Sequence, residues 1–256
     1  MKIAVIADVH ANLFALDVVL KDAKAKGAKE IWDLGDSVGY SPFPNECLAR
    51  MQRAKVKGIL GNYDKKVLDF PKMKKSWQGQ KHPAKYFSFQ WASRNLSRSN
   101  NLYLRKLPEK LEMARKGVRF LLVHGSPLSI DEALGTGTPK QRFLELAKAV
   151  DADVVLCGHS HGFFNKKVAG IRFVNPGSVG RSFDGEPMAS YVMLEINDGV
   201  LHVKNYRIDY ENDKNLKRMR QEKFPLVLID SIRLGRSIDE LKQCRSTKQN
   251  SVVAKR

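Results

Sequence analysis

The stretch that decides the fold is the N-terminal run KIAVIADVH, residues 2–10. An apolar run of strand length stops at Asp8, and His10 follows two positions later. The next segment, residues 13–26, carries leucine and valine at helical spacing. A strand that leads into a helix, with a carboxylate and an imidazole at the junction, predicts the first unit of an α/β fold.

The same pattern recurs along the chain. Further strands are predicted at residues 30–34, 57–60, 119–123, 154–156, 172–174, 191–196 and 201–207, and further helices at 45–54, 83–96 and 139–150. Four of these strands also end in polar side chains beside glycine, in the stretches DLGDSVGY, GILGNYDKK, FLLVHGSP and VLCGHSH. The pattern predicts a mixed sheet, in one sheet or two packed sheets, covered by helices. Residues 65–110 interrupt it, and we expect a Lys-rich loop and one helix there, inserted against the core.

The polar residues at the strand ends are predicted to meet, because ligand sites in open α/β sheets lie at the carboxyl ends of the strands. Glycines beside them allow tight turns and close backbone approach. His159 and His161, two apart on an extended chain, are expected to point to the same side. The set of seven groups is Asp8, His10, Asp36, Asn62, His124, His159 and His161.

Seven converging groups are too many for one metal ion and suit two ions about 3.5–4 Å apart, an arrangement used to hydrolyse phosphate esters. Oxygen and imidazole ligands without thiolate favour Mn²⁺, Fe or Zn²⁺. We favour Mn²⁺.

Composition narrows the class of protein. The chain has 256 residues, 43% of them apolar, and a net charge of +18. Its three cysteines are widely spaced, and it shows neither a signal peptide nor an apolar run long enough to cross a membrane. We therefore expect a cytoplasmic protein without a disulfide framework.

Positive charge is concentrated in residues 65–119, which hold fifteen basic and three acidic residues. Aromatic residues are interleaved there. The segment is therefore consistent with two functions, binding of nucleic acid and attraction of smaller phosphorylated substrates. Residues 241–256 add five basic residues without an acid or apolar periodicity, which predicts a flexible tail. The sequence predicts no oligomeric state.

The motifs Asp8-Val9-His10, Gly35-Asp36, Gly61-Asn62-Tyr63-Asp64, His124-Gly125 and Gly158-His159-Ser160-His161 resemble those of calcineurin-like metallophosphoesterases, in the small bacterial and archaeal phosphodiesterase branch. The stretches GYSPFPNE, NPGSVG and DGEPMASYVML are also similar to that branch. The resemblance covers about residues 1–236, so we expect one domain over 1–236 with the insertion at 65–110, followed by a basic tail over 237–256. It implies a four-layer α/β/β/α sandwich.

The resemblance also implies roles for the site residues. Asp8, His10 and His161 would hold one ion, and Asn62, His124 and His159 the other. Asp36 would bridge the two ions, with a bridging hydroxide as nucleophile. The catalytic residues would then be Asp36, Asn62 and His124.

Two further residues are candidates for substrate contact together with Asn62. Many family members carry histidine where this chain has Tyr63. A phenol there either donates a proton or hydrogen bond, or simply forms a wall of the pocket; its ordinary pKa of about 10 suits general-acid work poorly. Arg181, in NPGSVGRS, either contacts the substrate phosphate or lies solvated on a turn.

The leading prediction is a metal-dependent phosphoesterase that prefers phosphodiesters or nucleotide-type substrates. The alternatives are a phosphomonoesterase or protein Ser/Thr phosphatase with the same centre, and a polyanion-binding protein with a vestigial site. The intact set of seven ligands argues against the last of these.

Overall fold

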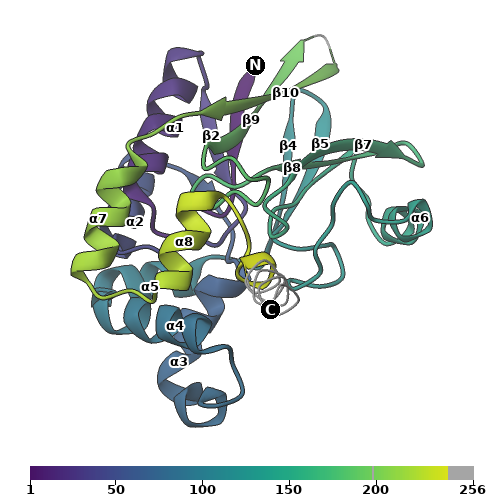
Figure 1. The fold of residues 1–256 in the computed structure, drawn as a ribbon. Coiled ribbons are helices and arrows are strands. Elements are labelled where there is room, and N and C mark those ends of the chain that lie inside the picture. Colours follow the sequence, from purple (N-terminus) through teal and green to yellow (C-terminus); the bar gives the residue numbers. More distant parts are fainter. Residues whose placement is uncertain (198, 242–256) are drawn as a thin grey trace, which may run out of the picture.

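The structure is a computed structural model that describes residues 1–197 and 199–241. Two five-stranded mixed sheets pack face to face (Figure 1). The first has the strand order β10 (Val200–Ile208), β9 (Ala189–Asn197), β1 (Lys2–Ile6), β2 (Glu30–Asp33) and β3 (Lys57–Gly58). The second has the order β4 (Lys110–Arg115), β5 (Val118–Val123), β6 (Val154–Leu156), β8 (Ile171–Pro176) and β7 (Phe163–Val168).

Each sheet contains three adjacent parallel strands, β1-β2-β3 in one and β5-β6-β8 in the other. In the first sheet β9 and β10 extend this set antiparallel on the side of β1, and in the second β4 and β7 pair antiparallel at the two edges. All seven residues that we expected to meet follow the parallel strands. Their carboxyl ends therefore form one edge of each sheet, where loops can bring side chains together.

The alternation of side chains along β1 explains the layers. Ile3 and Val5 point into the core between the two sheets, whereas Ala4 and Ile6 point into the core beneath the helices. Because both faces are covered, the strand is apolar throughout. Helices α1 (Leu13–Ala25) and α2 (Pro44–Arg53) cover the first sheet, and α6 (Lys140–Lys148) covers the second (Figure 1). The predicted four-layer α/β/β/α sandwich is confirmed.

The segment expected to be a Lys-rich loop and one helix is instead three helices, α3 (Asn62–Trp77), α4 (Pro83–Asn95) and α5 (Arg98–Lys106). The prediction of a loop was wrong because α3 buries only a short stripe, including Val67, Leu68 and Phe70, while lysines occupy its exposed face. Pro71 inside the helix also weakens the helical signal.

Four other elements were not predicted from the sequence. Strands β4 and β7 lie at sheet edges; β4 alternates charged with apolar residues, and β7, FFNKKV, places three polar or charged residues in a row. Helices α7 (Asn212–Gln221) and α8 (Leu226–Leu234) pack through Leu216, Met219, Leu228 and Ile232 into a fourth apolar cluster, which also contains Ile238. Residues 237–241 are thus part of the folded chain, whereas 242–256, most of the predicted tail, lie outside the described residues.

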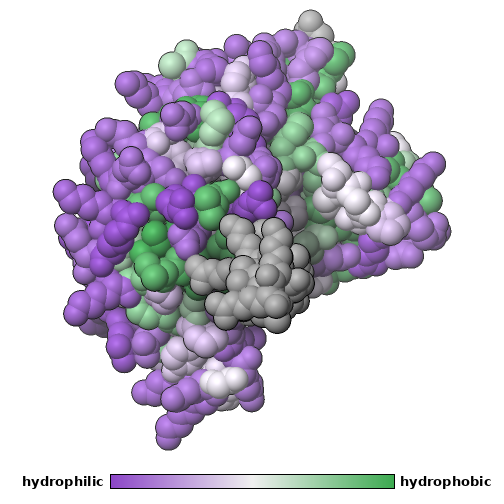
Figure 2. Space-filling view, in the orientation of Figure 1, coloured by the Kyte–Doolittle hydropathy of each residue, from purple (hydrophilic) through white to green (hydrophobic). Residues whose placement is uncertain are grey.

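The outer surface is hydrophilic over most of the face shown in Figure 2, as expected for a chain with a net charge of +18. None of the helices in the described ranges has both the length and the apolar character needed to cross a membrane. Cys47 and Cys157 are buried free thiols; Cys244 lies outside the described residues.

Candidate metal centre

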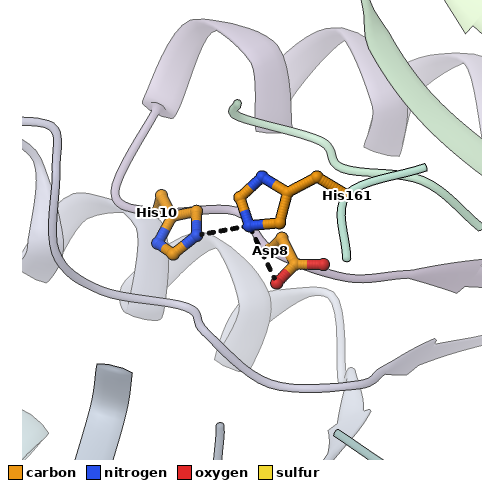
Figure 3. Close-up of side chains that lie close together, drawn as sticks. All are labelled: Asp8, His10 and His161. Carbon is orange, nitrogen blue, oxygen red and sulfur yellow. Dashed lines mark hydrogen bonds and ion pairs between the residues drawn. The ribbon is translucent and has the colours of Figure 1, made fainter. Parts of the chain in front are cut away.

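The first cluster of predicted ligands comes from the ends of β1 and β6. The Nε2 atoms of His10 and His161 lie 3.2 Å apart, and Nε2 of His161 lies 3.5 Å from Oδ1 of Asp8 (Figure 3). All three side chains are buried. Residues 151 positions apart in the sequence thus point at one place, as predicted.

The second cluster comes from the ends of β3, β5 and β6. Nε2 of His124 lies 3.2 Å from Oδ1 of Asn62 and 3.2 Å from Nδ1 of His159. His124 and Asn62 are buried, and His159 is half-buried at the wall of a cavity. The structure therefore brings together the second predicted set of three ligands.

Asp36 lies between the two clusters. Its Oδ2 is 3.7 Å from Nε2 of His10 and 3.5 Å from Nε2 of His124. Asp8 also faces both clusters: one of its carboxylate oxygens lies within 4.8 Å of ligand atoms of His10 and His161, and likewise of Asp36 and His124. The placement agrees with the bridging position expected for Asp36.

The hydrogen bonds around the imidazoles fit metal ligands. Nδ1 of His124 donates to the carbonyl oxygen of Leu34 at 2.8 Å, and Nδ1 of His161 donates to that of Arg181 at 2.5 Å. Because a carbonyl oxygen only accepts, each ring carries a proton on Nδ1, and its Nε2 faces the cluster. Oδ1 of Asp8 is buried and lacks a hydrogen-bond partner within the described chain. These atoms suit a divalent cation.

Burial keeps most of these imidazoles in the form that binds metal. It lowers the pKa of His10 to about 3 and also lowers the pKa values of His159 and His161. His124 differs: burial opposes its charge, but the Asp36 carboxylate outweighs burial and raises its pKa to about 10. A cation bound there would displace the His124 proton, because metal ligands must be deprotonated.

The backbone at the site differs from the extended chain expected around His159 and His161. Both residues have positive φ, 65° and 61°. Asp8, His10 and Asp36 share this left-handed conformation, with φ of 55°, 48° and 59°. Such conformations are uncommon for residues other than glycine and cluster at functional sites. The histidines therefore face different clusters: His161 lies beside His10, and His159 beside His124.

Close approach of two turns explains two of the glycines. A Cβ at Gly61 would lie 2.1 Å from the backbone nitrogen of Asp36, and a Cβ at Gly35 would lie 2.5 Å from that of Gly61. Both distances are far shorter than an ordinary van der Waals contact. The turns that carry Asp36 and Asn62 can pack together only without these side chains.

Asp64 belongs to the third motif, Gly61-Asn62-Tyr63-Asp64, but the sequence predicted no role for it. Its buried carboxylate accepts hydrogen bonds from the backbone N–H groups of Asp36, Ser37, Val38 and Gly61, at 2.9 to 3.3 Å. It thereby holds the Asp36 turn against the Asn62 turn. Its place two residues after Asn62 in GNYD was the only signal.

Asp131 was also missed, and no motif marks it. Its Oδ1 accepts from Nδ2 of Asn62 at 2.6 Å and from Nζ of Lys66 at 2.8 Å. An amide that donates through Nδ2 presents Oδ1 to the opposite side, here toward His124. Asp131 therefore orients Asn62.

Tyr63 and Arg181 both line the cavity beside the ligands. The hydroxyl of Tyr63 is hydrogen-bonded to that of Tyr40, and burial raises the Tyr63 pKa well above its ordinary value. Arg181 is 5% exposed, so the interpretation as a solvated turn residue was wrong. Its guanidinium lies 3.7 Å from the centre of the Tyr40 ring.

The aromatic residues of the basic segment are largely packed against protein. Phe70 and Phe89 are buried, and Trp77, Tyr86 and Trp91 pack onto the apolar clusters beneath them. Since stacking of bases needs an open ring face, these contacts do not favour a single-strand stacking surface. Binding of nucleic acid through the charge of residues 65–119 stays a prediction.

Residues 1–199 match the family model of the calcineurin-like phosphoesterase superfamily domain. The chain therefore belongs to this superfamily, as its motifs predicted. It is 28% identical over 266 residues to an uncharacterized protein of Methanocaldococcus jannaschii, an alignment that spans 91% of this chain and 98% of that protein.

Solved structures agree with the family. A metallophosphoesterase from Sphaerobacter thermophilus has a TM-score of 0.75 and 28% identity, over 92% of this chain and 100% of that one. A hypothetical protein from Pyrococcus horikoshii has a TM-score of 0.83 and 22% identity, over 90% and 97% of the two chains. At that identity the second likeness shows the fold alone.

Proposed function

We propose that this protein hydrolyses phosphate esters with two divalent transition-metal ions, and that it prefers phosphodiesters or nucleotide-type substrates. The observation that carries the proposal is the pair of ligand clusters joined by Asp36, with Nε2 atoms of both clusters 3.5 and 3.7 Å from the same carboxylate oxygen. Membership of the calcineurin-like phosphoesterase superfamily supports it.

The ligand sets follow the clusters. Asp8, His10 and His161 would hold one ion, Asn62, His124 and His159 the other, and Asp36 both. When bound, two such ions lower the pKa of water and neutralise the oxygens of a phosphate ester. Mn²⁺ is the ion we favour, since the set has oxygen and imidazole but no thiolate.

The other residues define the substrate side. The pairing of Tyr63 with Tyr40, and the raised pKa of Tyr63, make this phenol a poor acid and favour its role as a pocket wall. Because Tyr63 then supplies no general-acid catalysis, esters with poor leaving groups should turn over slowly. Asn62 lies in the second ligand cluster and Arg181 lines the cavity beside the clusters, which supports a contact of each with the substrate.

The test is hydrolysis by protein that has been stripped of metal and reloaded separately with Mn²⁺, Co²⁺, Ni²⁺ or Zn²⁺. Bis-p-nitrophenyl phosphate, p-nitrophenyl phosphate and a phosphoserine peptide represent the three substrate classes, and Asp36→Asn serves as the inactive control. We expect the diester to be cleaved with the highest kcat/KM. Faster cleavage of the monoester or peptide would favour the phosphatase alternative. No hydrolysis with any ion would contradict the proposal and favour the binding-protein alternative.

A further inference from the structure

A cavity of about 160 Å³ opens beside the ligand clusters. The predicted ligands Asp36, His159 and His161 form part of its wall. Other parts of the wall come from segments that hold no predicted metal ligand: Lys85 of α4, Arg181 and Phe183 of the loop after β8, and residues 237–239 after α8. The wall thus combines predicted metal ligands with side chains from outside the ligand set.

Arg181 is the unusual member of this wall. Its side chain is 5% exposed, yet no carboxylate within the described chain lies close enough to form an ion pair with it. Nη2 donates to Oγ of Ser231 at 3.0 Å, and Nε has no hydrogen-bond partner among the described residues. Atoms of the described residues thus accept hydrogen bonds from few of the five N–H donors of the Arg181 guanidinium.

The rings around Arg181 hold the guanidinium in place. It lies 3.7 Å from the centre of the Tyr40 ring and 4.7 Å from that of Phe183. Phe183 in turn stacks on His161, with ring centres 4.2 Å apart and planes 4° from parallel. Contact with aromatic faces offsets part of the cost of burying a cation but supplies no hydrogen-bond acceptor. The guanidinium is thus held in place by the two rings, and residues 1–197 and 199–241 supply no anionic partner for it.

A second cation faces the same cavity. Lys85 lines it, and the nearest acidic partner of its Nζ is Oδ2 of Asp239, 3.9 Å away at the limit of an ion pair. Asp239 is 72% exposed at its side chain, so this pair is weak and easily exchanged. One buried and one half-exposed cation therefore border a space that also touches the metal ligands.

We propose that Arg181 and Lys85 form an anion subsite for a second phosphoryl group, adjacent to the scissile one on the same substrate. This inference deepens the proposed function and rests on it: the two metal ions would neutralise the scissile group, and the subsite would bind its neighbour. The substrate class is thus a phosphate ester whose reacting phosphorus is linked to another phosphoryl group, as in a nucleoside diphosphate ester.

The size of the cavity supports this class. Pockets that enclose a drug-sized ligand commonly measure about 300–1,000 Å³. A cavity of about 160 Å³ is smaller and has room for charged phosphoryl groups, whereas an attached nucleoside would remain at the mouth. Arginine suits such a group because its planar donors match phosphate oxygens in pairs.

A binding experiment without metal separates this subsite from catalysis. Inorganic phosphate is titrated into protein stripped by EDTA, at fixed ionic strength, and heat is recorded by calorimetry for wild type, Arg181→Gln and Lys85→Gln. We expect binding by wild type that weakens about tenfold or more in Arg181→Gln, since a charge-assisted hydrogen bond is lost, and about threefold in Lys85→Gln. Lys24→Gln, an exposed lysine of α1, should bind as wild type does.

Equal affinity in all four proteins would show only adventitious attraction to a basic surface and would overturn the subsite. If Arg181→Gln does not fold, Arg181→Lys and Lys85→Gln carry the test, because the lysine keeps the charge and Lys85 is half-exposed. Because no hydrolysis is measured, failure here leaves the proposed hydrolysis intact. Phosphate binding without hydrolysis by the metal-loaded protein would keep the anion site but overturn its assignment to a hydrolysed substrate.

The enzymatic arm uses two substrates with the same leaving group, the p-nitrophenyl esters of thymidine 5′-monophosphate and of thymidine 5′-diphosphate with the p-nitrophenyl group on the terminal phosphorus. We expect the metal-loaded wild type to show about a tenfold lower KM for the diphosphate ester at similar kcat. In Arg181→Gln the two KM values should converge. An unchanged KM ratio in that variant would contradict a role in binding the second group.

Discussion

Nδ2 of Asn62 donates a hydrogen bond to Oδ1 of Asp131 at 2.6 Å, while Oδ1 of Asn62 faces His124 at 3.2 Å. An amide can rotate so that either atom faces a metal, and only its oxygen is a good ligand. Asp131 removes this freedom because a carboxylate accepts hydrogen bonds but cannot donate them when ionised. The loop after β5 thus determines which atom of Asn62, the first residue of α3, faces a cation.

Asp131→Asn is therefore expected to weaken metal binding in the cluster of Asn62, His124 and His159. Loss of a partner that orients a ligand typically costs about 10–100-fold in metal affinity or activity. Titration of metal-free protein with Mn²⁺ measures the effect. Asp151→Asn, which changes an exposed carboxylate paired with Arg119 at the other end of β5, is the matched control. Equal affinities in both variants would remove the orienting role of Asp131.

Tyr63→Phe is expected to keep kcat/KM within about threefold of wild type, since the lost hydroxyl is bonded to Tyr40 and its raised pKa makes it a poor acid. Asp36→Asn, measured alongside on bis-p-nitrophenyl phosphate, should lose roughly a hundredfold or more, because a shared metal ligand is changed. If the two variants lose comparable activity, the phenol takes part in catalysis and the pocket-wall interpretation is wrong.

Asp64→Asn is expected to destabilise the fold by about 2–4 kcal/mol, because the amide places a donor against backbone N–H groups that donate to both carboxylate oxygens. The free energy of unfolding in urea gives the change directly. Asp69 lies farther along the same helix, α3, and Asp69→Asn should alter the free energy of unfolding by less than about 0.5 kcal/mol. A comparable loss in Asp69→Asn would show that charge on the helix, rather than the bonds of Asp64, is responsible.

Glu30 provides a test of pH dependence away from the metal centre. Hydrogen bonds from Arg115, at 2.7 and 3.1 Å, and from Lys57, at 2.8 Å, lower its pKa from 4.5 to about 2. A lowered pKa stabilises the fold above the unfolded value, and the stabilisation is lost as the pH falls from about 4.5 toward 2.

Glu30→Gln should therefore cost about 1 kcal/mol of unfolding free energy at pH 6, and the difference from wild type should shrink at pH 3.5. Urea unfolding at both pH values measures it. Comparison with wild type at each pH cancels the titration of other groups, and Glu145→Gln, at an exposed pair with Arg142, controls for charge loss. A difference that stays constant down to pH 3 would contradict the assignment.

The sequence predicted which polar side chains lie together better than it predicted the helices around them. Each predicted ligand follows a strand of a parallel set, and the carboxyl ends of such strands lie together, so the position of Asp36 or His124 follows from topology. Helix α3 was missed because its apolar stripe is short and its lysines dominate the local composition. Strand β4, which alternates charged and apolar residues at a sheet edge, was missed for a similar reason.

The remaining parts of the site depend on contacts that no local pattern encodes. Asp131 reaches Asn62 across 69 residues, and Ser231 reaches Arg181 across 50. The left-handed backbone of His159 and His161 is also imposed by the surrounding turns, because most histidines prefer negative φ. An extended chain was the reasonable expectation from residue type alone.

The proposed pair of metal ions is tested most directly by counting them. Metal-free wild type is titrated with Mn²⁺ in a calorimeter, and bound metal is quantified after gel filtration by mass spectrometry. Two ions per chain are expected for wild type, about one for His161→Ala and for Asn62→Ala, and weakened binding at both positions for Asp36→Asn. One ion or none in wild type, or a stoichiometry that none of these substitutions changes, would contradict a centre built from these seven side chains.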